Sequence, residues 1–295
     1  MPLQDAILFG MKASIMMSVL AIGLDTTWAE ASYLFRHPRR LLQAVISMNI
    51  IMPLFAIAAA FLLPLAGPVK LALIALSVSP VPAGFAKKAM KMGGTEAYVI
   101  GLLVSAAIVA LISVPLAIEF IGPIFGVEAQ MSLPAVAALM TTTILIPLLA
   151  GMAVRLARAR LAVSLARPLA VIADGILALA ALAIVVAAWQ QIMTLVGNGS
   201  VALFVAFTLV ALVAGHFFGG PNSNDRAALA VATATRHPGV AIAIATANFP
   251  GQRLPAAAVL LYLLVSAVVF VPYGYWRRQQ KSSAGRSAQG HAGAG

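Results

Sequence analysis

The chain has 295 residues, of which 62% are hydrophobic and 9% are charged, and its mean hydropathy is +1.01. These values exclude an ordinary soluble domain and predict an integral membrane protein with room for about nine helical spans of about 20 residues each. The chain has no cysteine, which excludes disulfides and thiol chemistry, and its net charge of +11 lies in short connections, which argues against a nucleic-acid partner.

Apolar runs separated by turn residues and charges predict an all-α protein with nine transmembrane helices. All spans should be helical, because lipid gives the backbone no other hydrogen-bond partner. We expect one transmembrane domain over residues 1–276 and a disordered cytoplasmic tail over 277–295, since the tail has little apolar surface to bury. The predicted spans are 5–24, 40–66, 69–92, 95–121, 133–154, 168–189, 200–219, 226–248 and 254–276.

A short interfacial helix is predicted between the first two spans. Thr27 and Glu30 have the spacing of a capping box, and Trp28, Leu34 and Phe35 are apolar side chains suited to a membrane surface.

The distribution of basic residues predicts the orientation in the cell membrane. The odd-numbered connections and the tail hold fifteen of the 19 lysines and arginines, whereas the opposite connections hold only Lys70 and Arg253. The positive-inside rule therefore places the N-terminus outside and the C-terminus in the cytoplasm. The fifteen are Arg36, Arg39, Arg40, Lys87, Lys88, Lys91, Arg155, Arg158, Arg160, Arg167, Arg226, Arg277, Arg278, Lys281 and Arg286.

Two of the spans are interrupted by residues that cannot continue a helix. The third contains Ser-Pro-Val-Pro-Ala-Gly at 79–84, and the eighth contains Thr-Arg-His-Pro-Gly at 235–239. Proline removes a backbone donor, so each interruption frees backbone groups inside the membrane. Simple proline kinks are one explanation. The matching positions in the two halves of the chain favour the other, an inverted-repeat transporter whose site lies where two discontinuous helices cross.

Basic residues at the interruptions predict an anion site. Arg236 lies inside an apolar span, where an ionisable side chain is costly and usually functional; its alternative role is to cap carbonyls of its own broken helix. Lys87 either faces the crossing or extends to the surface. The second half-helices begin near Phe85 and Gly239, and their free amides favour anions.

These residues and their order resemble the bile acid:sodium symporter family. The resemblance is carried by Ile-Gly-Leu at 22–24, Arg-His-Pro-Arg at 36–39, Met-Pro-Leu at 52–54, the Ser79-Pro80 interruption, and the segment from Arg-Ala-Ala-Leu-Ala at 226–230 to Gly-Val-Ala at 239–241. It implies two inverted repeats of five helices, arranged as panel and core domains with substrate between them. Nine spans imply that the first helix of that fold is missing here.

The resemblance also implies two sodium sites built from polar side chains, and this chain departs from them. The corresponding positions hold Phe85, Ala86, Val99, Leu103, Met48, Ala232 and Arg236. Because a hard cation needs several oxygen ligands, we expect no sodium at the usual positions and no other metal or cofactor. A fixed guanidinium, together with Lys87, would replace the missing ions.

Further polar residues are candidates with structural alternatives. Asn49 could donate to substrate, and Thr142 could line the cavity or bond back to its own helix. Asp174 is either an ion-pair partner of Arg155, Arg167 or Lys12, or a proton site. The residues that we expect at the substrate site are Arg236, Lys87, His237, Gly239, Pro80, Pro82, Gly84, Asn49 and Thr142.

The sequence therefore predicts a secondary transporter of a small organic anion that works by alternating access. Sodium coupling through atypical ligands, proton coupling through His237, and uniport stay open as alternatives. A channel is a further class. An enzyme is not expected, because the metalloprotease and serine-hydrolase motifs and a carboxylate pair are missing. Substrate identity and oligomeric state are not encoded in any pattern that we can interpret.

Overall fold

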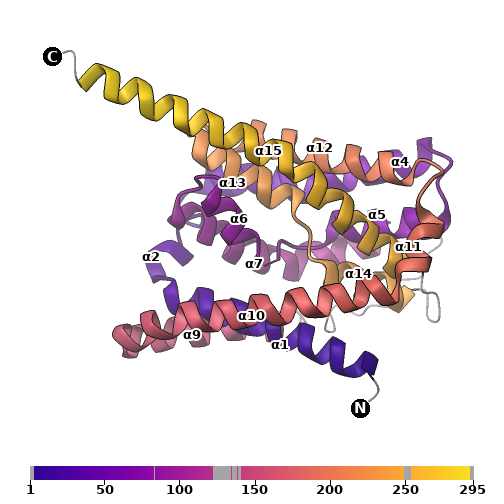
Figure 1. Ribbon diagram of the computed structural model, residues 1–295, viewed down its shortest axis with the longest axis horizontal. Helices are drawn as coiled ribbons and strands as arrows, with labels where there is room; N and C mark the ends of the chain where they lie inside the picture. Colours follow the sequence, from indigo (N-terminus) through magenta and orange to yellow (C-terminus); the bar gives the residue numbers. More distant parts are fainter. Residues whose placement is uncertain are drawn as a thin grey trace.

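The computed structural model describes residues 3–82, 84–121, 141–248 and 254–292, together with positions 134 and 138. Within these ranges every regular element is a helix (Figure 1). The first half contains α1 (Leu3–Asp25), α2 (Trp28–Ala31), α3 (Pro38–Val45), η1 (Ile46–Ile51), α4 (Met52–Leu62), α5 (Gly67–Val78), α6 (Phe85–Lys91) and α7 (Glu96–Ile121). The second contains η3 (Thr141–Leu145), α9 (Ile146–Ala157), α10 (Ala159–Ala187), α11 (Trp189–Leu195), α12 (Ser200–Phe218), α13 (Ser223–Ala234), α14 (Pro238–Asn248) and α15 (Leu254–Ala292).

Within the described residues, five helical stretches are long and apolar enough to cross a membrane. They are Pro38–Leu62, Glu96–Val114, Ala159–Ala187, Ser200–Phe218 and Leu254–Gln280. Two shorter apolar helices, Gly67–Val78 and Thr141–Ala157, accompany them. This composition agrees with an all-α membrane protein.

The helices α1, α9 and α10 pack chiefly against one another and form a layer along the lower edge of the view in Figure 1. Glycines allow α1 and α9 to approach closely. A Cβ at Gly151 would lie 2.5 Å from the carbonyl oxygen of Leu20, and one at Gly23 would lie 2.3 Å from that of Leu148. Small residues at such a contact let two backbones meet inside a membrane.

The other helices surround a continuous apolar core. Most of α7 is buried in it, since 67% of its most apolar stretch lies inside the protein, compared with 12% for α10. Phe204, Phe207 and Tyr262 pack their rings together, with centroids 5.6–5.8 Å apart in the two pairs that involve Tyr262. Most of the core therefore lies among the larger group of helices. Val19 of α1 and Leu148 and Met152 of α9 also belong to it, and α10 lies at its margin.

Two π-helical turns interrupt the second and fifth predicted spans, and each ends two residues before a proline. The turn η1 precedes Pro53 in α4, and η3 precedes Pro147 in α9. A proline removes the donor for the carbonyl four residues earlier, and a wider turn accommodates that loss. The prolines are visible in the sequence, but the π-helical turns were not predicted.

A buried carboxylate joins α13 to α3 and to the start of α7. Asp225, at the start of α13, is 3% exposed. It accepts hydrogen bonds from Arg40 of α3 at 3.1 Å and from Thr95, just before α7, at 2.9 Å. The sequence analysis missed this residue, because Asp225 in a polar segment before a helix looks like a capping side chain.

The predicted capping box is present. Thr27 accepts from the backbone N–H of Glu30, and Glu30 accepts from the backbone N–H of Thr27. The short helix α2 follows, with Trp28 58% exposed.

Several predicted boundaries need correction. The sixth span begins at Ala159 and not near residue 168, because α10 continues through Pro168, whose missing N–H removes only one helical bond. The sequence predicts that the last span ends at Trp276, and α15 extends beyond it to Ala292; the disorder of the tail stays a prediction. Lys, Arg, Gln and Ala in this stretch are good helix formers. The predicted start of the fifth span lies outside the described residues.

Gly151→Leu should separate α1 from α9, because the added side chain would overlap the backbone of α1. We expect a loss of about 1–3 kcal/mol or more in folding stability, measured as a lower unfolding temperature in detergent. Gly175→Leu on α10 is the control, since a Cβ there meets nothing within 4 Å. Equal effects of the two substitutions would contradict the close approach of α1 and α9.

Candidate functional site

The first interruption separates α5 from α6. α5 ends at Val78, Ser79 adopts an extended conformation, and α6 begins at Phe85. Pro80 and Pro82 explain the ending, because a proline disfavours helical geometry in the residue before it and cannot donate a backbone hydrogen bond. Residue 83 lies outside the described residues.

The second interruption separates α13 from α14. α13 ends at Ala234, Thr235 is extended, and α14 begins at Pro238. The hydroxyl of Tyr262 in α15 donates to the carbonyl of Ala234 at 2.6 Å. The last turn of α13 thus has a side-chain donor for one of the carbonyls that the end of a helix leaves without a helical partner. Tyr262 was not singled out from the sequence, although a hydroxyl in an apolar span signals the need for an acceptor.

Direct hydrogen bonds join the two interruptions. The backbone N–H of His237 donates to the carbonyl of Pro80 at 2.9 Å. His237 is 5% exposed, and its Nδ1 accepts from the backbone N–H of Val240 at 3.4 Å, so its ring caps the start of α14. The two breaks, 157 residues apart in the chain, therefore meet, as the sequence predicts.

Arg236 occupies the meeting point. It is 2% exposed and donates to the carbonyl of Ser79 at 3.1 Å and to that of Met48 in η1 at 3.0 Å. These acceptors belong to other elements, so the alternative that Arg236 caps its own helix is wrong. Ser79 is the C-cap of α5, where the helix dipole is negative and favours a cation.

The charge of Arg236 is balanced by backbone carbonyls. Among the described residues, no carboxylate forms an ion pair with it. Its Nε and the neighbouring Thr235 hydroxyl are buried without a hydrogen-bond partner in the described part of the chain. The crossing thus contains a buried cation with one nitrogen, Nε, that has no hydrogen-bond partner in the described part of the chain.

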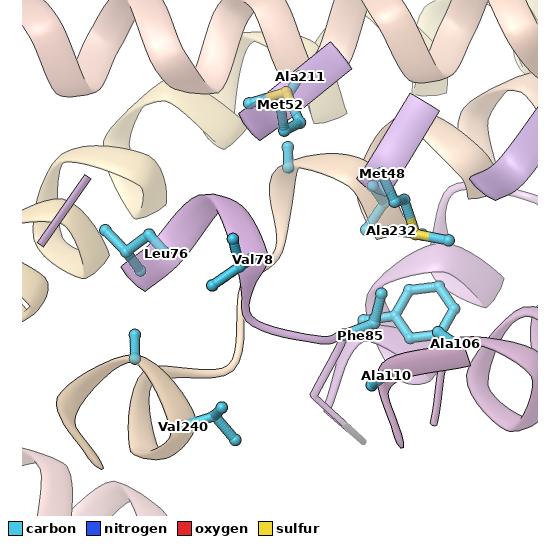
Figure 2. Packing of buried hydrophobic residues seen from close by; sticks show 14 of the residues in the cluster. Met48, Met52, Leu76, Val78, Phe85, Ala106, Ala110, Ala211, Ala232 and Val240 are labelled. Atoms are coloured by element: carbon cyan, nitrogen blue, oxygen red, sulfur yellow. The ribbon is translucent and has the colours of Figure 1, made fainter. Parts of the chain in front are cut away.

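Apolar side chains fill the surroundings. Met48 and Ala232 lie close together in Figure 2, with Phe85 nearby. These three positions, and those of Ala86, Val99 and Leu103, are at most 3% exposed and belong to one core cluster. All six are positions where the family resemblance implies sodium ligands, and none of these side chains carries an oxygen.

A second polar contact, a hydrogen bond between two hydroxyls, connects η1 to α13. The hydroxyls of Ser47 and Thr233 are 2.8 Å apart, and both residues are fully buried. Together with the Arg236–Met48 bond, this contact holds the π-helical turn against the crossing.

Lys87 has a partner in the other layer of helices. Its Nζ donates to the Asp174 carboxylate of α10, and the side chains are 46% and 51% exposed. The sequence predicts Arg155, Arg167 or Lys12 as the ion-pair partner of Asp174, and this prediction is wrong. Arg155 instead pairs with Asp25, with 3.5 Å between a guanidinium nitrogen and a carboxylate oxygen. Lys87 is close in sequence to the interruption, but its charge is directed to α10 and not to Arg236.

The remaining predicted site residues lie in different environments. Pro80 is buried, Pro82 and Gly239 are partly buried, and Gly84 is exposed. Asn49 is partly exposed in η1, next to Met48, whose carbonyl binds Arg236. Thr142 lies in η3 and its hydroxyl donates to the carbonyl of Ala138 at 2.7 Å, which is the back-bonding alternative of the sequence analysis. Of these residues, His237 bonds directly to Pro80, and Arg236 bonds to Ser79, the residue before Pro80.

Comparison with known protein families shows which family the chain belongs to. The sequence profile of the sodium bile acid symporter family matches residues 13–214. The protein belongs to this family. The match includes the first interruption and ends before the second, so the crossing extends beyond it. A search of curated proteins finds no match.

The family and the apolar helices together identify a multi-pass membrane protein and a transporter of the sodium/bile acid symporter type. Family membership implies a small organic substrate.

Tyr262→Phe should destabilise the protein, because it leaves the Ala234 carbonyl without its donor. We expect a loss of about 1–3 kcal/mol, measured as a lower unfolding temperature in detergent. Tyr275→Phe on the same helix is the control, since Tyr275 is 66% exposed. No difference between the two variants would show that the end of α13 does not depend on this bond.

Proposed function

We propose that the protein is a secondary transporter that carries a small organic anion by alternating access without sodium at the usual family positions. The supporting observation is that the Arg236 guanidinium donates to the carbonyls of Ser79 and Met48. In this proposal a permanent positive charge occupies the place of a dissociable ion.

Electrostatics supports this replacement. Two unit charges about 4 Å apart repel by about 4 kcal/mol at the effective dielectric constant typical of proteins. A sodium ion near Ser79 would meet this repulsion, and the apolar side chains around the crossing provide no carboxylate to offset it. A hard cation also needs about six oxygen ligands, far more than these two carbonyls.

We propose that the helices form nine spans in two groups that move relative to one another. The layer of α1, α9 and α10 would be the panel domain, and the remaining spans would form the core domain around the crossing. The packing of the three helices chiefly against one another supports this division. The interrupted pairs α5–α6 and α13–α14 would be equivalent elements of an inverted repeat. The charge distribution of the connections supports an external N-terminus and a cytoplasmic C-terminus.

In this proposal Lys87 is the cation that contacts the substrate. Its ion pair with Asp174 joins α6 of the proposed core to α10 of the proposed panel and is half-exposed. Exposed pairs are worth little, about 0.2–1 kcal/mol, so an incoming carboxylate can displace Asp174. Asp174 would thus pair with Lys87 whenever no substrate anion is bound. Arg236, closed off from solvent, would contribute the field of its charge.

Proton coupling through His237 is a weaker candidate. The ring caps α14 and is buried, so protonation at Nδ1 would break the bond to Val240. Sodium coupling with atypical ligands differs from our proposal in one measurable respect, because it requires sodium for uptake.

Uptake of a labelled organic anion into proteoliposomes should be the same with sodium and with potassium at equal ionic strength. The substrate is first found by a thermal-shift screen of small carboxylates and sulfonates. Arg236→Gln should lower uptake by about tenfold to a hundredfold, because charge-assisted hydrogen bonds are worth about 1.5–3 kcal/mol. Arg236→Lys keeps the charge and should retain more activity. A strict requirement for sodium would contradict the proposal.

Lys87 and Asp174 should have opposite effects on substrate affinity. Asp174→Asn frees Lys87 and should lower the KM for the anion by about twofold to fivefold, whereas Lys87→Gln should raise it. Asp25→Asn breaks another exposed pair in the same layer and should leave KM unchanged. If Asp174→Asn raises KM, the carboxylate assists binding and the exchange mechanism is wrong.

A further inference from the structure

An apolar groove lies between α12 and α15, away from the crossing, with a volume of about 750 Å³. This volume is within the range of ligand sites, about 300–1,000 Å³. Val213, Phe217 and Val269 contribute apolar walls, and Tyr273 and Trp276 of α15 lie beside His216 in the last turn of α12. Val213 and Phe217 are 68% and 79% exposed on a helix suited to span the membrane, so the groove is open to the hydrocarbon of the bilayer.

One end of the groove is basic. Arg226 and His216 line it. Arg226 uses its Nε to donate to the carbonyl of Gly220 at 2.5 Å, and in the described part of the chain no acidic side chain pairs with its guanidinium. The adjacent Asp225 is directed away, since it binds Arg40 and Thr95. The basic end is therefore available to an anion.

Aromatic residues mark the depth of this basic end. The Trp276 ring lies 5.6 Å from that of His216 and 5.7 Å from that of Tyr273. Tryptophan and tyrosine concentrate where lipid headgroups meet hydrocarbon. A cation beside such rings and an apolar groove leading away from it complement a molecule with a negative head and a hydrocarbon tail.

We propose that this groove binds an anionic phospholipid of the bilayer. The phosphate faces Arg226 and His216, and one acyl chain lies along Val213, Phe217 and Val269. Basic pockets between membrane helices bind anionic headgroups in this manner. The bound lipid joins α12, the start of α13 and α15 at the side that carries most of the basic residues.

Trp276 provides a direct measurement, because the chain has three tryptophans and the other two can be replaced. The test uses the full-length Trp28→Phe, Trp189→Phe variant in phosphatidylcholine vesicles. A small fraction of the lipid is either brominated phosphatidylglycerol or brominated phosphatidylcholine. We expect the anionic lipid to quench Trp276 emission with about fivefold higher apparent affinity, as one cation near a headgroup predicts.

Arg226→Gln in the same background should abolish the preference, and Arg226→Lys should retain most of it. Arg160→Gln, an exposed arginine at the start of α10, is the control and should leave the preference intact. If Arg226→Gln does not fold, Val213→Phe should weaken quenching by narrowing the groove without changing charge.

Three outcomes would overturn the proposal. Equal quenching by the two brominated lipids would show that the groove does not select charge. An equal loss in Arg160→Gln and Arg226→Gln would show general surface attraction. Reversal by millimolar inorganic phosphate would show that the basic end recognises phosphate without the lipid. Each result is independent of whether the proposed transport mechanism is correct.

Discussion

The structure depends on satisfying the backbone groups that the two helix breaks release in the buried core. An apolar core offers no water, so each freed carbonyl and N–H needs a partner within the protein. Arg236 binds the carbonyls of Ser79 and Met48, and the N–H of His237 binds Pro80. One basic segment therefore ties together two interrupted helices and a π-helical turn.

This arrangement separates two kinds of positive charge. Arg236 is buried, held by carbonyl dipoles and inaccessible from solvent, whereas Lys87 is half-exposed and paired with a carboxylate of another helical layer. A buried charge with fixed partners is suited to organise a site, and a weakly paired charge is suited to exchange partners. In the proposed mechanism the first replaces an ion and the second receives the substrate.

Features that depend on local chemistry were predictable. The prolines at 80 and 238 predicted both interruptions, and the spacing of Thr27 and Glu30 predicted the capping box that precedes α2. Features that depend on distant partners were not. Asp174 binds Lys87 and not the basic residues nearer to it in its own connections, and Tyr262 caps a helix 28 residues earlier in the chain. The two π-helical turns follow from prolines, but their effect depends on how each span packs.

The sequence by itself determined the membrane class, the helical state, the positions of both breaks and the burial of one arginine, because hydropathy and proline chemistry act over a few residues. Only the tertiary structure decided that the breaks bond to each other, that Arg236 serves carbonyls of other elements, and that Lys87 reaches α10. These outcomes depend on the three-dimensional packing of helices far apart in the chain, where burial and the need for hydrogen-bond partners select one pairing from many that composition permits.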